Sequence, residues 1–286
     1  MKIGLTSDLH TDISPANRKI VKYIVSSAKE AKLDLLVIAG DLSPNLMELA
    51  RTLIAFRELD CPKLFVAGNH DIWVMNDNRF TSQEKYELIS KICKEYGFHN
   101  LDDGPFVFDR IGFCGTIGWY DYSFKCEDYN IPEKKYKLKC FGDSVWNDVN
   151  YAKWNCSDLE LTLRFRSELK KQIRSIEHTT SQIIVVTHHV PFRECVIYRG
   201  QQKWDFFNAF MGSKVFGEMC VNEPSVTHAL FGHSHHPFNK KIQGVTAICS
   251  PIGYLYDLSE NEFESYARKR LAVITVESSS VKLDIP

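Results

Sequence analysis

The amino-acid sequence predicts an α/β fold with a mainly parallel β-sheet and a second sheet packed on it. In the first half of the chain, short apolar runs alternate with segments of helical periodicity in a βαβαβα order. Successive parallel strands are joined by right-handed crossovers, so helices are expected on the faces of this sheet. Five further apolar runs follow, mostly separated by turn-like sequences, and they predict the second sheet.

The chain begins with a strand and a capped helix. Residues 2–7 (KIGLTS) form an apolar run that predicts the first strand. Ser14 and Pro15 then provide an N-cap and a first helical residue, and the helix is expected to continue to about Lys32. Apolar residues recur along it at helical spacing, at Ile20, Ile24 and Ala28.

A second and a third strand follow, with a helix between them. Residues 33–40 (LDLLVIAG) are a continuous apolar run of the kind found in buried parallel strands, and residues 63–68 (KLFVAG) are predicted to be the next strand. Ser43 and Pro44 are expected to open the intervening helix, which would end near Leu59.

Two capping boxes mark later helices. Thr81 with Glu84 precedes a helix that ends near Gly97, and Ser157 with Glu160 opens another. The second of these helices is expected to bury Leu163, Leu169, Ile173 and Ile176. The five remaining strand-like runs are residues 106–118, 183–189, 227–235, 244–253 and 270–278.

Composition and charge narrow the class of protein. The 286 residues, 44% of them hydrophobic, suffice for one large domain, 1–286, decorated by insertions. Lys plus Arg (35) nearly balance Asp plus Glu (36), so no overall basic field attracts nucleic acid or an anionic membrane. The sequence shows no leader pattern, and none of its apolar runs approaches the roughly 18 residues of a membrane span. We therefore expect a cytoplasmic protein. Nine cysteines without a C-x-x-C pair fit reduced, mostly buried thiols.

Five polar clusters come directly after apolar strands. In open α/β sheets the loops at this edge converge on one crevice, where ligands bind. Glycines before three of the polar residues are expected to allow sharp turns that aim the side chains into the crevice. The clusters are Asp8-Leu9-His10, Gly40-Asp41, Gly68-Asn69-His70-Asp71, Thr187-His188-His189 and Gly232-His233-Ser234-His235.

The donor types in these clusters indicate a metal site. Carboxylates, imidazoles and one amide carbonyl together suit Zn, Mn or Fe better than Ca or Mg alone. One metal would not use so many groups, whereas two metals would. Taken singly, each cluster also fits an ordinary structural role, such as a strand-end turn or a helix N-cap. That explanation requires five coincidences at one sheet edge.

The ordered series D-x-H, G-D, G-N-H-D, H and G-H-x-H resembles the calcineurin-like metallophosphoesterase superfamily, from Asp8 to His235. The resemblance implies two packed mixed β-sheets flanked by helices, a four-layer α/β/β/α sandwich. It implies two divalent or transition metal ions, Mn, Fe or Zn, bridged by Asp41. The first ion would be held by Asp8, His10, Asp41 and His235, and the second by Asp41, Asn69, His188 and His233.

The resemblance also implies a mechanism. A hydroxide shared by the two metals attacks phosphorus in line with the leaving group. His70 lies next to Asn69 and belongs to neither ligand set, so it is the candidate to protonate the leaving oxygen. Asp71 is expected to orient the His70 imidazole. His189 and His236 adjoin ligands, and we expect them to line the pocket or to face solvent.

Two irregular segments, 119–155 and 192–222, are expected to form cap-like insertions beside the metal site. Five of their residues are candidates for contacts to phosphate or to a base. Aromatic residues of an inserted segment also commonly form a small core of their own, and both interpretations stay open. The candidates are Trp119, Tyr120, Arg193, Arg199 and Lys203.

The substrate class is narrowed by the same motifs. The stretches GDLSPN and GNHD depart from the Arg and Glu that protein serine/threonine phosphatases of the superfamily show at these places. GDLS, GNHD and THHVP resemble small phosphodiesterases, including those that act on cyclic nucleotides. We therefore expect hydrolysis of a small or nucleotide-type phosphoester, most simply a diester, with a monoester as the other case. The alternatives are a nuclease or protein phosphatase of the superfamily, or a non-catalytic metal-binding scaffold.

Overall fold

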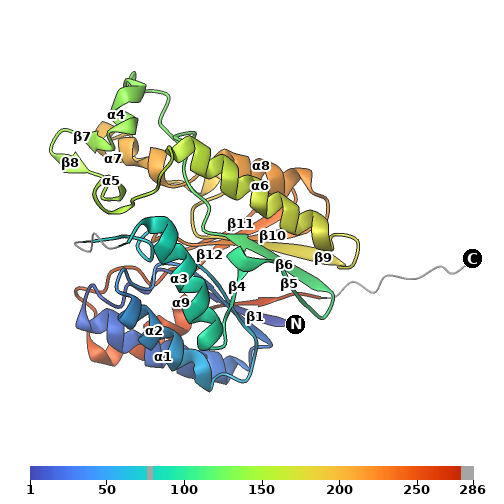
Figure 1. The fold of residues 1–286 in the computed structure, drawn as a ribbon. Helices are drawn as coiled ribbons and strands as arrows, with labels where there is room; N and C mark the ends of the chain where they lie inside the picture. Colours follow the sequence, from blue (N-terminus) through green and yellow to red (C-terminus); the bar gives the residue numbers. More distant parts are fainter. Residues whose placement is uncertain (76–79, 278–286) are drawn as a thin grey trace, which may run out of the picture.

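The computed structural model describes residues 1–75 and 80–277. Two large β-sheets pack face to face, and helices cover the outer face of each, which gives four layers (Figure 1). In Figure 1, helices α1, α2, α3 and α9 lie on one side of the sheets and helices α6 and α8 on the other. The four-layer α/β/β/α fold predicted above is confirmed.

The first sheet has the strand order β13-β1-β2-β3-β4. Strands β1 to β4 are parallel, and β13 runs antiparallel to β1. The run 270–278 was expected in the second sheet, and this expectation is wrong for β13, because β13 covers the otherwise open edge of β1; Ser278 lies outside the described residues. The strands are β1 (Lys2–Thr6), β2 (Leu35–Ala39), β3 (Lys63–Val66), β4 (His99–Asn100) and β13 (Ala272–Thr275).

The second sheet has the order β11-β12-β10-β9-β6-β5. Its four central strands are parallel and therefore need long crossovers, so the expectation of mostly short turns is wrong. Among the described strands of this sheet, tight turns join only the antiparallel pairs β5–β6 and β11–β12. The strands are β5 (Phe106–Phe108), β6 (Ile111–Thr116), β9 (Gln182–Thr187), β10 (Val226–Phe231), β11 (Phe238–Ile242) and β12 (Val245–Cys249).

The core between the sheets consists of alternate residues of their strands. Leu5 and Val37 of the first sheet belong to one fully buried cluster with Phe113, Val186 and Leu230 of the second. The intervening residues of the same strands point outward to the helices, as the two-residue period of a strand requires. Both faces of each central strand are thus apolar, and this explains their continuous apolar runs.

The helices begin largely where the sequence predicts. The Ser14 side chain accepts a hydrogen bond from Asn17 N at the start of α1 (Pro15–Ala31). The predicted capping box of Thr81 opens α3 (Ser82–Glu95). The predicted start of the helix between them is wrong: Asn45, not Ser43, caps α2 (Leu46–Ala55), and a short 3-10 turn, Phe56–Glu58, completes it.

Helix α6 (Asp158–Ile176) begins with the predicted capping box of Ser157. The prediction that Leu163 is buried is wrong, because 58% of its surface is exposed. Leu169 follows Leu163 by six positions, which places them on different faces of a helix with 3.6 residues per turn. The residues of this helix that face the core are Leu161, Thr162, Phe165, Leu169, Gln172, Ile173 and Ile176.

The segments 119–155 and 192–222 lie side by side at one end of the molecule (Figure 1). They pack through aromatic side chains: the rings of Tyr136 and Phe206 stack with centroids 4.8 Å apart, and those of Trp146 and Phe210 lie 5.6 Å apart. The elements here are α4 (Glu133–Lys137), β7 (Cys140–Phe141), β8 (Ser144–Val145), α5 (Asp148–Tyr151), α7 (Gln202–Phe207) and α8 (Lys214–Asn222).

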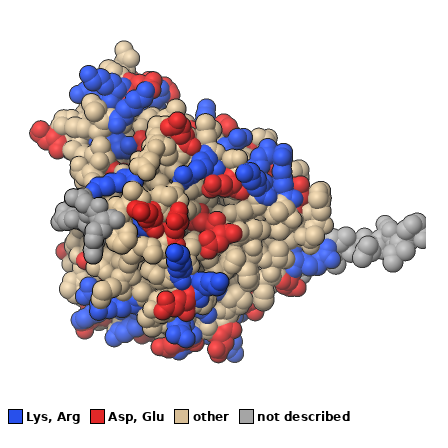
Figure 2. Space-filling model, in the orientation of Figure 1, with Lys and Arg blue, Asp and Glu red and all other residues tan. Residues whose placement is uncertain are grey.

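Helix α9 (Phe263–Arg270) packs against α1 and leads into β13. None of the helices in the described ranges is long and apolar enough to cross a membrane. On the face shown in Figure 2, acidic and basic side chains are interspersed, in keeping with the near balance of charge in the sequence.

Candidate metal centre

The structure brings the predicted strand-end residues together at the carboxyl edges of both sheets. Asp8, His10, Asp41 and His235 each offer a ligand atom within 4.8 Å of the others. His10 Nε2 lies 2.9 Å from His235 Nε2 and 3.6 Å from Asp41 Oδ2. His235 Nε2 lies 3.4 Å from Asp8 Oδ1. We refer to these four residues as the first ligand group.

A second group shares Asp41 with the first. The ligand atoms of Asp41, His188 and His233 also lie within 4.8 Å of one another. His188 Nε2 is 3.3 Å from Asp41 Oδ2 and 3.1 Å from His233 Nδ1. Asn69 Oδ1 lies 3.2 Å from the same histidine nitrogen. We refer to Asp41, Asn69, His188 and His233 as the second ligand group.

The spacing within the two groups fits metal ions. Ligands about 2.1 Å from one ion lie roughly 3.0 to 3.4 Å apart at octahedral or tetrahedral angles. The separations described here run from 2.9 to 3.6 Å. Imidazole nitrogens also face each other, in the pairs His10–His235 and His188–His233, which is the arrangement of lone pairs directed at a common cation.

Backbone conformation aims several of these side chains. Left-handed φ angles are uncommon outside glycine, and residues held in them cluster at functional sites. Of the described residues other than glycine, five candidate ligands have them: Asp8 (54°), His10 (44°), Asp41 (59°), His233 (67°) and His235 (52°). The sharp turns therefore come mainly from the ligands themselves.

The glycines before the ligands act in two ways. Gly40 has a φ of 83°, so it provides the turn that the sequence predicts. Gly68 and Gly232 do not have left-handed angles, and for them the expectation of a special turn is wrong. They are needed for space instead: a Cβ on Gly68 would lie 2.1 Å from Asp41 Oδ1, and one on Gly232 would lie 2.9 Å from Asp8 Oδ2.

Hydrogen bonds fix two of the imidazoles. His188 Nδ1 lies 2.8 Å from the carbonyl oxygen of Ala39 and donates to it, which leaves Nε2 to face the centre. His233 Nε2 lies 3.3 Å from the carbonyl oxygen of Phe210, which leaves Nδ1 to face the centre. In both histidines the nitrogen without this partner is the one that meets the other ligands.

The electrostatics of the two ligand groups favour a bound cation. Burial opposes charge on His188, but the carboxylates of Asp41 and Asp8 outweigh it and raise the pKa of His188 to about 9. Burial lowers the pKa of His10 to about 3. Burial also disfavours the charged form of Asp41, yet His188 and His70 hold the pKa of this carboxyl well below its usual range. Two buried carboxylates thus draw in positive charge, which bound metal ions would supply.

His70 lies beside both groups. Its ring stacks on Trp73, with centroids 3.6 Å apart, and meets the edge of His10 at 4.6 Å. Its backbone N–H donates to Asp41 Oδ1 at 2.9 Å, while its Nδ1 has no hydrogen-bond partner among the described residues. Burial lowers the pKa of His70, which favours the neutral imidazole.

Asp71 does not orient His70 as expected. Its carboxylate accepts hydrogen bonds of 2.7–2.9 Å from backbone N–H groups of the two loops that follow β2 and β3. These donors occupy both oxygens, and none of the described hydrogen bonds reaches the His70 ring. Asp71 instead ties the two loops together and so positions Asp41. The donors are the N–H groups of Asp41, Leu42, Ser43 and Gly68.

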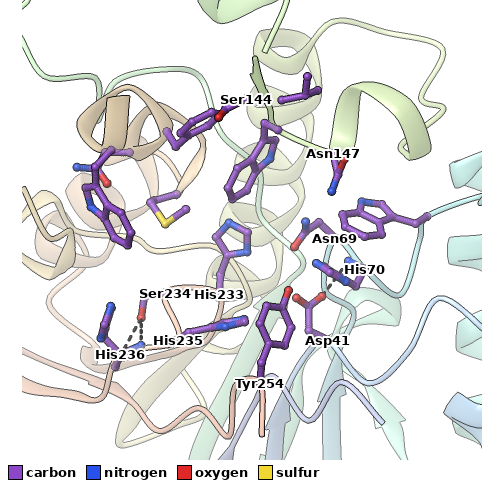
Figure 3. A pocket seen from close by; sticks show the side chains of 17 residues that line it. Asp41, Asn69, His70, Ser144, Asn147, His233, Ser234, His235, His236 and Tyr254 are labelled. Carbon is purple, nitrogen blue, oxygen red and sulfur yellow. Dashed lines mark hydrogen bonds between the residues drawn. The ribbon is translucent and has the colours of Figure 1, made fainter. Parts of the chain in front are cut away.

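A pocket of about 480 Å³ opens on the ligand groups (Figure 3). Its polar floor consists of Asp41, Asn69, His70, His233, Ser234, His235 and His236. Its insertion wall consists of Ser144, Val145, Trp146, Asn147, Trp204, Phe207, Asn208 and Met211. Figure 3 shows Ser144 and Asn147 on the opposite side of the pocket from Asp41 and His235. Trp73 and Tyr254 complete the lining.

The pocket has no lysine or arginine in its lining, as far as the described residues show. The candidate contacts Arg193, Arg199 and Lys203 therefore do not face it. Arg199 instead lies over the Trp204 ring, 3.6 Å from its centroid. Trp119 and Tyr120 are almost fully buried, as expected for the small core of an inserted segment. The interpretation of these five residues as substrate contacts is not supported.

The two remaining histidines of the clusters, His236 and His189, lie in different positions relative to the pocket. His236 lines the pocket, in line with the expectation that it adjoins the ligands without joining them. His189 is fully buried behind the ligands, with its ring 4.5 Å from that of His233 and its Nδ1 3.1 Å from the carbonyl oxygen of Ile117. It neither lines the pocket nor faces solvent, so the expectation for His189 is wrong.

Sequence reasoning missed three residues that shape the site. Tyr254 contacts the rings of His10 and His235, at 4.8 and 4.7 Å. Trp73 supports His70. Asp148 accepts a hydrogen bond from Asn69 at 2.9 Å. A single tyrosine, tryptophan or aspartate carries no pattern of its own. Only Trp73 lies near a motif, because GNHD ends two residues before it.

Known proteins resemble this chain in sequence and in fold. The family model described as calcineurin-like phosphoesterase matches residues 1–237, which is more than half of the chain. The chain belongs to the calcineurin-like phosphoesterase family. Membership implies a centre of divalent metal ions, and the two ligand groups provide a cluster of the required donor types in this calcineurin-like phosphoesterase.

Individual relatives extend the comparison. The acyl-carrier-protein phosphodiesterase PptH of Mycobacterium tuberculosis (strain ATCC 25618 / H37Rv) is 29% identical over 130 residues. That match spans 43% of this chain and 39% of the length of the relative. The crystal structure of the phosphopantetheinyl hydrolase PptH from the same species has a TM-score of 0.75 at 18% identity, covering 96% of both chains. A dimetal phosphatase from Danio rerio has a TM-score of 0.55 at 14% identity, covering 87% of this chain and 86% of its own. The two structures show a shared fold.

Proposed function

We propose that this calcineurin-like phosphoesterase hydrolyses a phosphodiester at a centre of two metal ions. The observation that carries the proposal is the pair of ligand groups that share Asp41 and open into one pocket. The first group would hold one ion and the second group the other. Four imidazoles among the donors favour Zn, Fe or Mn over Mg or Ca. When bound, two such cations acidify a shared water and neutralise charge on the phosphate.

The residues of the chain have separate roles in this proposal. Asp41 would keep the two cations close, and Asp71 would hold the Asp41 loop through backbone hydrogen bonds. His70 reaches the pocket beside both groups. Burial lowers its pKa, so it is the protonated fraction of His70 that would donate a proton to the leaving oxygen. The intact His70 favours an enzyme over a metal-binding scaffold, because a scaffold needs no proton donor.

The pocket favours a diester over a monoester. Enzymes that bind dianionic or polyphosphate groups commonly pair the extra charge with Arg or Lys, and neither type lines this pocket in the described part of the chain. A diester carries one negative charge, which the metal ions alone would balance. The insertion wall then offers Val145, Trp146, Phe207 and Met211 to an uncharged substituent.

Two observations support the same class. The relative from Mycobacterium tuberculosis bears the name of a phosphodiesterase, and its partial match lends support to a diester without identifying the substrate here. The balanced charge of the chain gives a long nucleic acid no overall basic field, so a small phosphodiester is preferred to the nuclease alternative. The insertions 119–155 and 192–222 would act as caps on a single domain and select the substituent.

A substrate panel tests the proposal. The protein, loaded with Mn²⁺, Zn²⁺ or Fe²⁺, is assayed with bis(4-nitrophenyl) phosphate, 4-nitrophenyl phosphate and a phosphoserine peptide. We expect kcat/KM to be highest for the diester and to disappear on treatment with a chelator. Higher kcat/KM for the monoester or for the peptide would contradict the diester assignment. No hydrolysis of any substrate would favour the scaffold.

A further inference from the structure

Asp148, in the first insertion, is a buried residue whose carboxylate contacts the metal site. Only 2% of its surface is exposed. Its Oδ1 accepts hydrogen bonds from Asn69 Nδ2 at 2.9 Å and from Trp73 Nε1 at 2.6 Å. Its Oδ2 accepts from Tyr120 OH at 2.9 Å and from Trp146 Nε1 at 2.7 Å. One carboxylate thus joins the floor of the pocket to its wall.

The contact with Asn69 fixes the direction of an amide. Because Asp148 is an acceptor, it must face the amide nitrogen of Asn69. The amide oxygen then faces the second ligand group, 3.2 Å from His188 Nε2. Without this partner the amide group of Asn69 could flip, so that its NH2 group would face the second ligand group. An NH2 group cannot bind a cation.

The contact with Trp73 reaches His70. The indole of Trp73 is held by Asp148 through its Nε1 and stacks on the His70 ring at 3.6 Å. Since His70 Nδ1 has no hydrogen-bond partner in the described structure, this stacking is a main restraint on the ring. Asp148 therefore acts on His70 through Trp73.

The two ligand groups differ in their contacts with the insertions. In the second group, Asn69 is held by Asp148, and His233 by the carbonyl oxygen of Phe210 from the second insertion. In the first group, His10 and His235 contact Tyr254, which lies outside both insertions. No described hydrogen bond or ring contact joins Asp8, His10 or His235 to an insertion. The insertions thus support one half of the centre.

We infer that Asp148 is a positioning residue that couples the packing of the first insertion to metal binding by the second ligand group. The inference rests on the proposed function for the two ions. Residues that orient metal ligands from behind typically change metal affinity by 10- to 100-fold when they are replaced. Loss of Asp148 should therefore weaken the second ion and leave the first ion bound.

Asp158 offers a matched control. It also accepts hydrogen bonds from an indole and a phenol, Trp119 Nε1 at 2.8 Å and Tyr122 OH, and it pairs with Lys139 Nζ at 2.5 Å. Its side chain is largely buried, with 12% exposed. None of these partners lines the pocket. Asp158→Asn therefore disturbs the packing around the first insertion without touching Asn69 or Trp73.

The experiment compares metal binding by the wild-type protein, Asp148→Asn and Asp158→Asn. Co²⁺ is added to the metal-free proteins and followed by calorimetry and by its visible absorption, which reports coordination. We expect Asp148→Asn to weaken the second equivalent of Co²⁺ at least about tenfold and to change its spectrum, with the first equivalent unchanged. Asp158→Asn should resemble the wild type in both measurements.

Three outcomes would overturn the inference: unchanged binding in Asp148→Asn, equal weakening of both equivalents, or the same loss in Asp158→Asn. If Asp148→Asn fails to fold, Asp148→Glu keeps the charge and displaces it by one methylene. The second equivalent should again weaken selectively, and an unchanged titration would overturn the inference. A wild-type protein that binds only one Co²⁺ would contradict the proposed function itself, whereas selective failure in the variants leaves that function standing.

Discussion

The polar floor and the insertion wall of the pocket are built in different ways. The floor comes from loops that follow strands of both sheets, and several of its side chains are aimed by left-handed backbone at the ligand residues themselves. The wall comes from two insertions whose aromatic residues pack mainly on one another. In the proposed function the floor would carry the reaction and the wall would select the substrate, and Asp148 links the two through its hydrogen bonds.

The largest effect is expected at the centre of the floor. Asp41→Asn removes the carboxylate that both ligand groups share and leaves an amide of the same size. We expect loss of the second bound ion, weaker binding of the first, and diester hydrolysis that falls to the level of the blank. Metal analysis after gel filtration, together with the bis(4-nitrophenyl) phosphate assay, checks this. Full activity in Asp41→Asn would contradict the claim that both ligand groups depend on the Asp41 carboxylate.

The next effect separates proton donation from metal binding. His70→Ala leaves every residue of the two ligand groups in place, so both ions should remain bound. Hydrolysis of an alkyl diester should slow by about 10²- to 10⁴-fold, because a poor leaving group needs the proton. Hydrolysis of a nitrophenyl diester should slow less, since nitrophenolate leaves without a proton.

His236→Ala is the matched control for His70→Ala, because His236 lines the same pocket and belongs to neither ligand group. Its kcat should stay within about threefold of the wild type, well below the effect of a lost proton donor. An equal loss for both leaving groups in His70→Ala would contradict the proton-donor role.

A smaller effect is expected at the wall. Phe207 lines the pocket and touches no residue of the ligand groups in the described contacts. Phe207→Ala should raise KM about tenfold for diesters with a large apolar substituent, which corresponds to about 1.4 kcal/mol of lost contact. The KM for dimethyl phosphate and the metal content should not change. A fall in kcat for both substrates would show that the wall takes part in the reaction.

The smallest effect is expected outside the pocket. Arg193 lies over the Tyr198 ring, 4.7 Å from its centroid, and does not line the pocket. Arg193→Ala should change kcat/KM for any phosphodiester by less than about twofold, as is usual for an exposed residue without a site contact. Steady-state kinetics at low ionic strength would reveal a phosphate contact if one existed, and a tenfold loss there would place such a contact on the insertions.

The individual residues of the floor were predictable from the sequence, whereas for the wall only the two segments 119–155 and 192–222 were. Asp8, Asp41 and His233 stand in short motifs at the ends of apolar runs, where fold rules alone bring loops together. Asp148 and Phe207 lie in segments without a regular period, so their neighbours depend on how the insertions pack. Neither their distance along the chain nor their residue type indicates a contact with the site.

Several errors have a common physical source. Ser43 and Asp71 were assigned by local rules, and tertiary contacts decided otherwise. Ser43 N donates to Asp71, so the helix cap moves to Asn45. Asp71 binds backbone N–H groups rather than the neighbouring His70. The strand β13 joined the first sheet because the chain crosses to that side between β12 and α9, which packs against α1, a path that local periodicity does not reveal.

The central claim is that Asp41 bridges two metal ions between the ligand groups. Anomalous diffraction from crystals grown with Mn²⁺ tests it most directly. The account predicts two peaks, one among Asp8, His10 and His235 and the other among Asn69, His188 and His233, both in contact with Asp41. A single peak at saturating Mn²⁺, or two peaks without a shared contact to Asp41, would contradict it.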